Sequence, residues 1–132
     1  MRIFIDTSAF FALLDRDDAN HLKSKRKWGD ILSYENTLVT SNYVLVECFA
    51  LMQSRIGLQA VRGFQEDVLP LINIEWVTSE IHKSGVSALL AASRRKLSLV
   101  DCVSFEIMRT LGIKTVFAFD LHFAEQGFKS IP

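Results

Sequence analysis

Apolar residues follow two alternating periods along the chain. Short runs rich in β-branched and aromatic residues predict strands, and apolar residues spaced three or four apart predict helices. The expected strands cover 2–6, 38–40, 71–77 and 115–119, with a last one at 128–131. The expected helices cover 8–16, about 20–33, 41–57, 58–69, 79–94 and 98–111, with a short one after 120.

Alternation of strands and helices predicts an α/β fold in which helices cover both faces of a mainly parallel sheet. No linker, repeat or low-complexity segment interrupts the pattern, and 132 residues suffice for one core but not for two. We therefore expect one domain over residues 1–132. Ligands of such sheets bind outside the carboxyl ends of the strands, where Asp6 and Asp120 stand.

Glu47 is the one charged residue in an apolar helical segment, 43–52. Its neighbours three and four positions away, such as Tyr43 and Leu51, offer no positive charge. A helix that is apolar all round is usually buried, and an unpaired buried carboxylate is costly. The sequence leaves three explanations open: a buried salt bridge, a side chain that points outward to solvent, or a bound metal ion.

Three other acids allow a purely structural explanation as well. Asp6 and Asp120 could each cap the helix that follows, and Asp101 has capping-box spacing from Ser98. Together with Glu47, however, they place four carboxylates near one edge of the sheet. Carboxylate oxygens suit Mg²⁺ or Mn²⁺, and without a cation such a cluster would repel itself. The pattern favours a site where a metal ion activates water against a phosphodiester.

Composition limits the other possibilities. The formal net charge is zero, so RNA binding would depend on a local basic cluster, and Arg94, Arg95 and Lys96 are the candidates. A second cluster around Lys23, Arg26 and Lys27 is more typical of a solvated helix face. With no apolar run long enough for a membrane span and two isolated cysteines, we expect a soluble cytoplasmic protein whose thiols are reduced.

Four stretches in order along the chain resemble the PIN-domain family, and in particular the VapC-like toxins of toxin–antitoxin pairs. They are Ile5-Asp6-Thr7-Ser8-Ala9, Thr40-Ser41 through Glu47, Leu99-Val100-Asp101, and Phe119-Asp120-Leu121-His122-Phe123 followed by Gly127-Phe128. The chain departs from the family at Ala118, where Thr or Ser is frequent, and at Cys102, where Ala is commoner.

The resemblance implies a three-layer α/β/α fold and Mg²⁺- or Mn²⁺-dependent cleavage of RNA. It makes Asp6 the central metal ligand, Glu47, Asp101 and Asp120 its companions in the catalytic metal site, and Ser8 the supporting residue of Asp6. It also implies an antitoxin partner and a homodimer. Apolar residues of the first and third helices would supply that contact, unless they belong to the core.

Three other functions share this fold class. A phosphotransfer receiver domain needs an acidic pair after the first strand and a Lys at the end of the last, and neither is present at Asp6-Thr7 or Phe119-Asp120. A haloacid-dehalogenase-type phosphatase needs an acid where Ser8 stands. A non-catalytic RNA- or protein-binding module on a PIN scaffold is expected to lose acidic positions, whereas all four are kept here.

Overall fold

The computed structural model describes every residue from Met1 to Pro132. In chain order, the strands are β1 (Arg2–Ile5), β2 (Thr37–Ser41), β3 (Asn73–Glu75), β4 (Thr115–Phe117) and β5 (Lys129–Ile131). The helices are α1 (Thr7–Leu14), α2 (His21–Leu32), α3 (Asn42–Arg55), α4 (Leu58–Gly63), α5 (Ser79–Ala92), α6 (Leu99–Leu111) and α7 (His122–Glu125), with a π-helical turn η1 (Phe64–Val68) and a 3₁₀ turn η2 (Leu69–Leu71). The expected alternation of strands and helices is confirmed.

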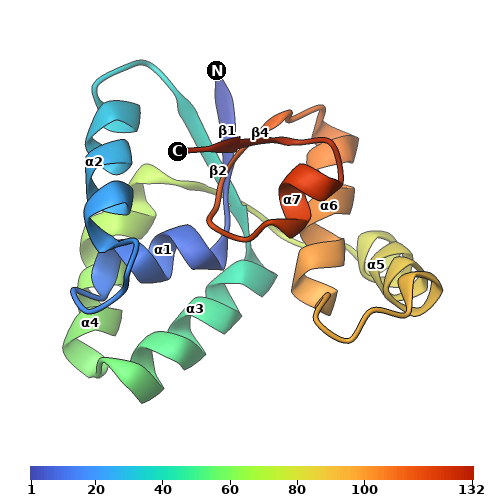
Figure 1. The fold of residues 1–132 in the computed structure, drawn as a ribbon, viewed down its shortest axis with the longest axis horizontal. Helices are drawn as coiled ribbons and strands as arrows, with labels where there is room; N and C mark the ends of the chain where they lie inside the picture. The colour runs from blue at the N-terminus through green and yellow to red at the C-terminus, as the bar shows by residue number, and fades with distance from the viewer.

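All five strands are parallel and form one sheet in the order β3-β2-β1-β4-β5. The central strand β1 is apolar because both of its faces are covered, and Ile3, Phe4 and Ile5 are at most 1% exposed. Figure 1 shows α1, α2 and α4 on one side of the strands and α5, α6 and α7 on the other. The expected three-layer α/β/α fold is confirmed. No helix combines the length and the apolar character needed to cross a membrane.

The strand order reverses between β1 and β4. From β1 the chain continues outward to β2 and β3 on one side, whereas β4 and β5 extend the sheet on the other side. The backbone N–H of Asp6 donates to the carbonyl of Phe117 at 3.0 Å, so the carboxyl ends of these two strands lie side by side. Such a reversal opens a crevice at the carboxyl edge, the usual ligand site of open α/β sheets.

Helix α3 lies across this carboxyl edge. It begins at the end of β2, where the hydroxyl of Ser41 accepts a hydrogen bond from the N–H of Val44 at 3.2 Å and caps the helix. It packs against α1 and also contacts α6. Because α1 follows β1 directly, α3 brings its residues to the same edge as the ends of β1 and β4.

Several expected boundaries are wrong by a few residues. The strand expected at 71–77 is shorter because η2, which contains Pro70, turns the chain before β3 begins. The helix expected at 58–69 divides into α4 and η1. Helix α5 is capped by Thr78, whose hydroxyl accepts from a backbone N–H at 3.2 Å, and not by Ser79. The strands expected at 2–6 and 115–119 end earlier, at Ile5 and Phe117, so Asp6 and Asp120 follow β1 and β4 and are not part of them.

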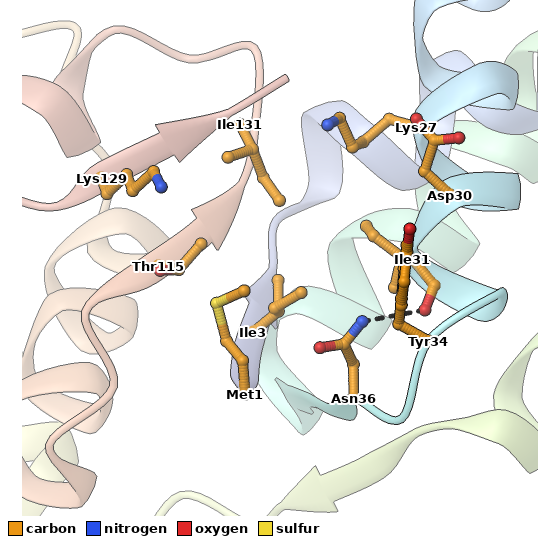
Figure 2. A pocket seen from close by; sticks show the side chains of 10 residues that line it. All are labelled: Met1, Ile3, Lys27, Asp30, Ile31, Tyr34, Asn36, Thr115, Lys129 and Ile131. Atoms are coloured by element: carbon orange, nitrogen blue, oxygen red, sulfur yellow. Dashed lines mark hydrogen bonds between the residues drawn. The ribbon is translucent and has the colours of Figure 1, made fainter.

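A hollow of about 470 Å³ separates α2 from β5 (Figure 2). Ile3 and Ile131 from the sheet and Ile31 from α2 give it an apolar wall. Figure 2 shows Lys27 and Lys129 on opposite sides of this hollow, one from the helix and one from the strand. The sheet face beside β5 is therefore only partly covered by helix.

Candidate active site

The four carboxylates of Asp6, Glu47, Asp101 and Asp120 line a single cleft. Asp6 follows β1, Asp120 follows β4, Asp101 lies in the first turn of α6, and Glu47 lies on α3. The cleft has a volume of about 340 Å³, within the range of ligand-binding pockets. The structure thus brings together residues that are up to 114 positions apart, counted from Asp6 to Asp120 (120 − 6).

Asp6 is 3% exposed and is held in place by the start of α1. Its Oδ2 accepts hydrogen bonds from the backbone N–H of Ser8 at 3.2 Å and from the Ser8 hydroxyl at 2.7 Å. That hydroxyl oxygen in turn accepts from the N–H of Phe119 at 3.0 Å. Ser8 therefore fixes the Asp6 carboxylate and also joins the end of β1 to the segment that carries Asp120.

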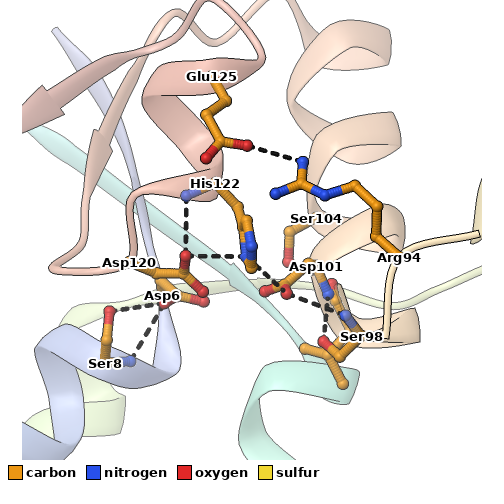
Figure 3. Close-up of polar contacts among 10 residues, drawn as sticks. Asp6, Ser8, Arg94, Ser98, Asp101, Ser104, Asp120, His122 and Glu125 are labelled. Carbon is orange, nitrogen blue, oxygen red and sulfur yellow. Dashed lines mark hydrogen bonds and ion pairs between the residues drawn. The ribbon is translucent and has the colours of Figure 1, made fainter. Parts of the chain in front are cut away.

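Asp101 and Asp120 are fixed by similar local contacts (Figure 3). The Ser98 hydroxyl accepts from the Asp101 N–H at 3.0 Å, and Oδ2 of Asp101 accepts from the Ser98 N–H at 3.1 Å, which completes a capping box. Oδ1 of Asp120 accepts from the N–H of His122 at 2.8 Å. The capping explanation that the sequence allowed is therefore correct for Asp6 and Asp101. It is wrong for Asp120, because the N-cap of α7 is Leu121; the Asp120 carboxylate instead closes the turn that precedes this helix.

Capping uses only one oxygen of each of these carboxylates. The other oxygen of each, which is Oδ1 of Asp6, Oδ1 of Asp101 and Oδ2 of Asp120, accepts no hydrogen bond from the chain. Capping and ligand binding are therefore compatible at the same residues. The caps orient the carboxylates and leave one oxygen of each available to the cleft.

Glu47 is half-buried, and its surroundings differ from the expectation. Helix α3 is not buried all round, because Val46 is 69% exposed and Ala50 is exposed as well. No Lys, Arg or His lies within 4 Å of the Glu47 carboxylate, so the salt-bridge explanation is wrong. Glu47 instead presents its charge to the cleft that Asp6 lines.

Burial and mutual repulsion shape the electrostatics of the cleft. Desolvation raises the pKa of Asp6 from 3.8 to about 7, the Ser8 hydrogen bonds oppose this, and the charges of Asp101 and Asp120 add to it. Desolvation also raises the pKa of Asp101, opposed by the contacts with Ser98 and reinforced by Asp120. A divalent cation would compensate this concentration of negative charge, and the free oxygens of the three aspartates are suitable ligands for one.

In the absence of metal ions, we expect the free energy of unfolding to fall as the pH rises from about 4 to about 7. The folded chain binds the Asp6 proton more tightly than the unfolded chain does, so the resulting stabilisation is present at low pH and lost as the carboxyl ionises. For a pKa raised from 3.8 to about 7, the loss is on the order of 4 kcal/mol. Urea unfolding in chelator, followed by circular dichroism at several pH values, measures it.

Asp6→Asn is the matched control for this pH dependence, since it keeps the cap and removes the titrating group. The variant should lose most of the fall in stability between about pH 4 and about pH 7. A wild-type stability that stays level or rises over this range would contradict the buried, mutually repelling cluster.

His122 also belongs to the cluster, and it is not among the site residues that the sequence predicted. Its Nδ1 lies 3.0 Å from Oδ1 of Asp120 and 3.6 Å from Oδ2 of Asp101, without hydrogen-bond geometry to either. One ligand atom from each of these three residues lies within 4.8 Å of the others. The signal in the sequence was its position two residues after Asp120, which places it at the start of α7.

The three basic residues expected to bind RNA have different surroundings. Lys96 lines the cleft beside the carboxylates. Arg94 forms an ion pair with Glu125 at 2.8 Å (Figure 3), so its charge is already partnered. Arg95 is exposed and does not line the cleft. Of the three, Lys96 is the cation best placed to meet an anionic ligand.

Comparison with known proteins agrees with this geometry. The family model for the PIN domain matches residues 3–129. Two curated relatives, both described as the 23S rRNA-specific endonuclease VapC20 and from two strains of Mycobacterium tuberculosis, are 35% identical over 130 residues, which is 98% of this chain and 97% of the relative. A crystal structure of M. tuberculosis VapC20, described as a sarcin–ricin loop cleaving toxin, superposes with a TM-score of 0.84 at 35% identity over 96% of this chain and 95% of that one.

Proposed function

The chain belongs to the PIN-domain family and is a ribonuclease of the VapC toxin type, and on this premise we propose that it cuts ribosomal RNA in the cleft formed by Asp6, Glu47, Asp101 and Asp120. The observation that carries the assignment of the site is that all four acids line one cleft at the strand-order reversal. The phosphotransfer receiver and the non-catalytic scaffold are set aside, because the chain belongs to a nuclease family and all four acidic residues expected from the resemblance are present in its sequence.

PIN nucleases use divalent metal ions, and we assign Mg²⁺ or Mn²⁺ to this chain because the available ligand atoms are carboxylate oxygens. Asp6, Asp101 and Asp120 would hold the ion through their free oxygens, with Asp6 as the central ligand that the family resemblance implies, and Glu47 would complete the site from α3. When bound, such an ion activates water and stabilises negative charge on the phosphodiester. Ser8 keeps the Asp6 carboxylate in position through its two hydrogen bonds.

Other residues of the cleft bind and position the RNA. The Lys96 ammonium group provides a positive charge for a phosphate close to the carboxylates. Arg94 and Arg95 contribute less to RNA binding than the sequence suggested, since Arg94 is paired with Glu125. The imidazole of His122 limits the movement of the Asp101 and Asp120 side chains against which it lies.

Ribosomal RNA is the substrate class that the relatives support. The relatives named above are 23S rRNA-specific endonucleases, and they match this chain over nearly its full length. We expect the purified protein, incubated with bacterial ribosomes and Mg²⁺ or Mn²⁺, to produce a discrete cut in 23S rRNA that primer extension locates. Parallel incubations with a tRNA pool and with messenger RNA serve as controls. Discrete cleavage of tRNA with intact 23S rRNA would reassign the substrate without affecting the nuclease.

Three expectations stay predictions: that a single domain spans residues 1–132, that an antitoxin binds the chain, and that the chain forms a homodimer. Of the apolar residues on the first and third helices, Phe10 and Met52 are at most 1% exposed and belong to the core, which is one of the two interpretations that the sequence allowed. A different apolar hollow lies on α3 and β3, and exposed Val46 and Trp76 border it. That hollow is the surface available for a protein partner.

A further inference from the structure

Two of the basic residues of helix α2 border hollows in the surface, and two do not. Lys23 and Lys27 are four residues apart and so lie on one face of the helix, and each of them lines a hollow. Lys25 and Arg26 are exposed and line neither hollow. Lys23 and Arg26 are exposed, as expected of a solvated helix face, whereas Lys27 is half-buried.

The hollow at Lys23 adjoins the active-site cleft. It has a volume of about 450 Å³, and Lys23 faces the segment that follows β4 across it. Phe119 and Asp120 line both this hollow and the cleft. An RNA strand that leaves the cleft past Asp120 therefore enters a space bordered by Lys23.

The hollow at Lys27 lies further along α2 and is the one shown in Figure 2. Lys27 on the helix and Lys129 on β5 border it from opposite sides, above an apolar wall that includes Ile31. Tyr34 stands at its border and is 76% exposed. One acid, Asp30, also lines this hollow.

The three lysines have no ionic partner within the chain. None of Lys23, Lys27 and Lys129 has a carboxylate within 4 Å. Both hollows are bordered by α2 and β5, and along them the three unpaired lysines outnumber the two acidic residues, Asp30 and Asp120. In a chain of zero formal net charge, they mark a local positive strip. Single-stranded nucleic acid is bound by this combination of a basic groove with exposed aromatic and apolar surface for the bases.

We propose that the strip formed by Lys23, Lys27 and Lys129, between α2 and β5, binds the sugar–phosphate backbone of the RNA on the Asp120 side of the bond that is cut. The inference rests on the proposed function, because it assigns a path to the substrate of the same cleft. Phosphates contact the three lysines, and a base packs on the Tyr34 ring. Sequence preference is not a property of the strip, since lysine contacts to phosphates carry no base information.

The test compares two double variants of one helix. Fluorescence anisotropy measures binding of a fluorescein-labelled oligouridylate over a series of salt concentrations, in chelator so that the RNA stays intact. Each lost phosphate contact on a single strand reduces the slope of log affinity against log salt by about 0.7. We expect Lys23→Gln with Lys27→Gln to reduce the slope by about 1.4, and Lys25→Gln with Arg26→Gln to leave it unchanged.

Lys129 is tested in the same way on the other side of the strip. We expect Lys129→Gln to reduce the slope by about 0.7, and Lys114→Gln, an exposed lysine outside both hollows, to leave it unchanged. Thermal melts check that all variants fold like the wild type. If the two α2 double variants show equal slopes of log affinity against log salt, the proposal that the strip binds RNA is wrong. Cleavage of RNA by the wild type is measured separately, so failure of the strip and failure of the nuclease assignment are distinguishable.

Discussion

Asp6→Asn is expected to lower kcat/KM for RNA cleavage by roughly two to three orders of magnitude, the loss typical of removing one charge-stabilising group from an active site. Asn cannot supply the negative oxygen that a divalent ion needs, although it matches Asp in shape. Cleavage of a labelled RNA under single-turnover conditions measures the effect. Asp67→Asn makes the same chemical change at an exposed acid of η1 and should leave the rate unchanged.

The stability of Asp6→Asn separates loss of the site from loss of the fold. Asn also caps helices, and the substitution removes a buried charge that faces Asp101 and Asp120. In chelator the variant should therefore melt at the same temperature as the wild type or higher. An Asp6→Asn protein that is folded and cuts RNA at the wild-type rate would remove Asp6 from the catalytic assignment.

Removal of divalent ions is the second large effect. We expect cleavage to stop completely in chelator and to return when Mg²⁺ or Mn²⁺ is added in excess, because the carboxylates alone offer no means of activating water. The same ions should raise the melting temperature of the wild type, since they bind only the folded cleft. Differential scanning fluorimetry with and without each ion measures the shift.

Asp6→Asn and Glu47→Gln serve as controls for the metal-dependent melts. Both variants should be stabilised much less than the wild type by the same concentration of ion. RNA cleavage that continues unchanged in chelator would contradict the metal site. Equal stabilisation of the wild type and both variants would place the binding of the ion elsewhere on the protein.

The edge of the sheet where the site lies could be predicted from the sequence, because it follows from the order and direction of the strands alone. Asp6 and Asp120 each follow a short apolar strand, and parallel strands end at one edge, so their proximity could be predicted without side-chain coordinates. The same reasoning could not predict the surroundings of Glu47. Apolar neighbours along a helix do not reveal that Val46 faces solvent, which depends on how α3 packs on α1 and α6.

Residues whose role depends on contacts between distant segments were the hardest to predict. His122 lies against Asp101 only because α7 packs on α6. At this contact the ring centroids of Phe123 and Phe105 are 5.0 Å apart. Lys23 borders the hollow beside the cleft because α2 faces the segment after β4, and no local pattern in the sequence encodes that pairing. The limits of β3 depend on the turns η1 and η2 that precede it. Secondary-structure propensity averaged over a window of residues does not detect such short turns.

Asp6 caps a helix, Asp101 completes a capping box, and both also belong to the proposed active site. This double role affects which mutations inactivate such a toxin in a population of cells. Asparagine caps a helix about as well as aspartate, and any aspartate codon becomes an asparagine codon by one base change. Under the proposed assignment, a folded but inactive chain is thus a single mutation away at each of these positions. Cells that survive an unopposed toxin should accumulate such substitutions at Asp6 and Asp101, and their inactive chains should still be produced in full and recognised by any protein partner.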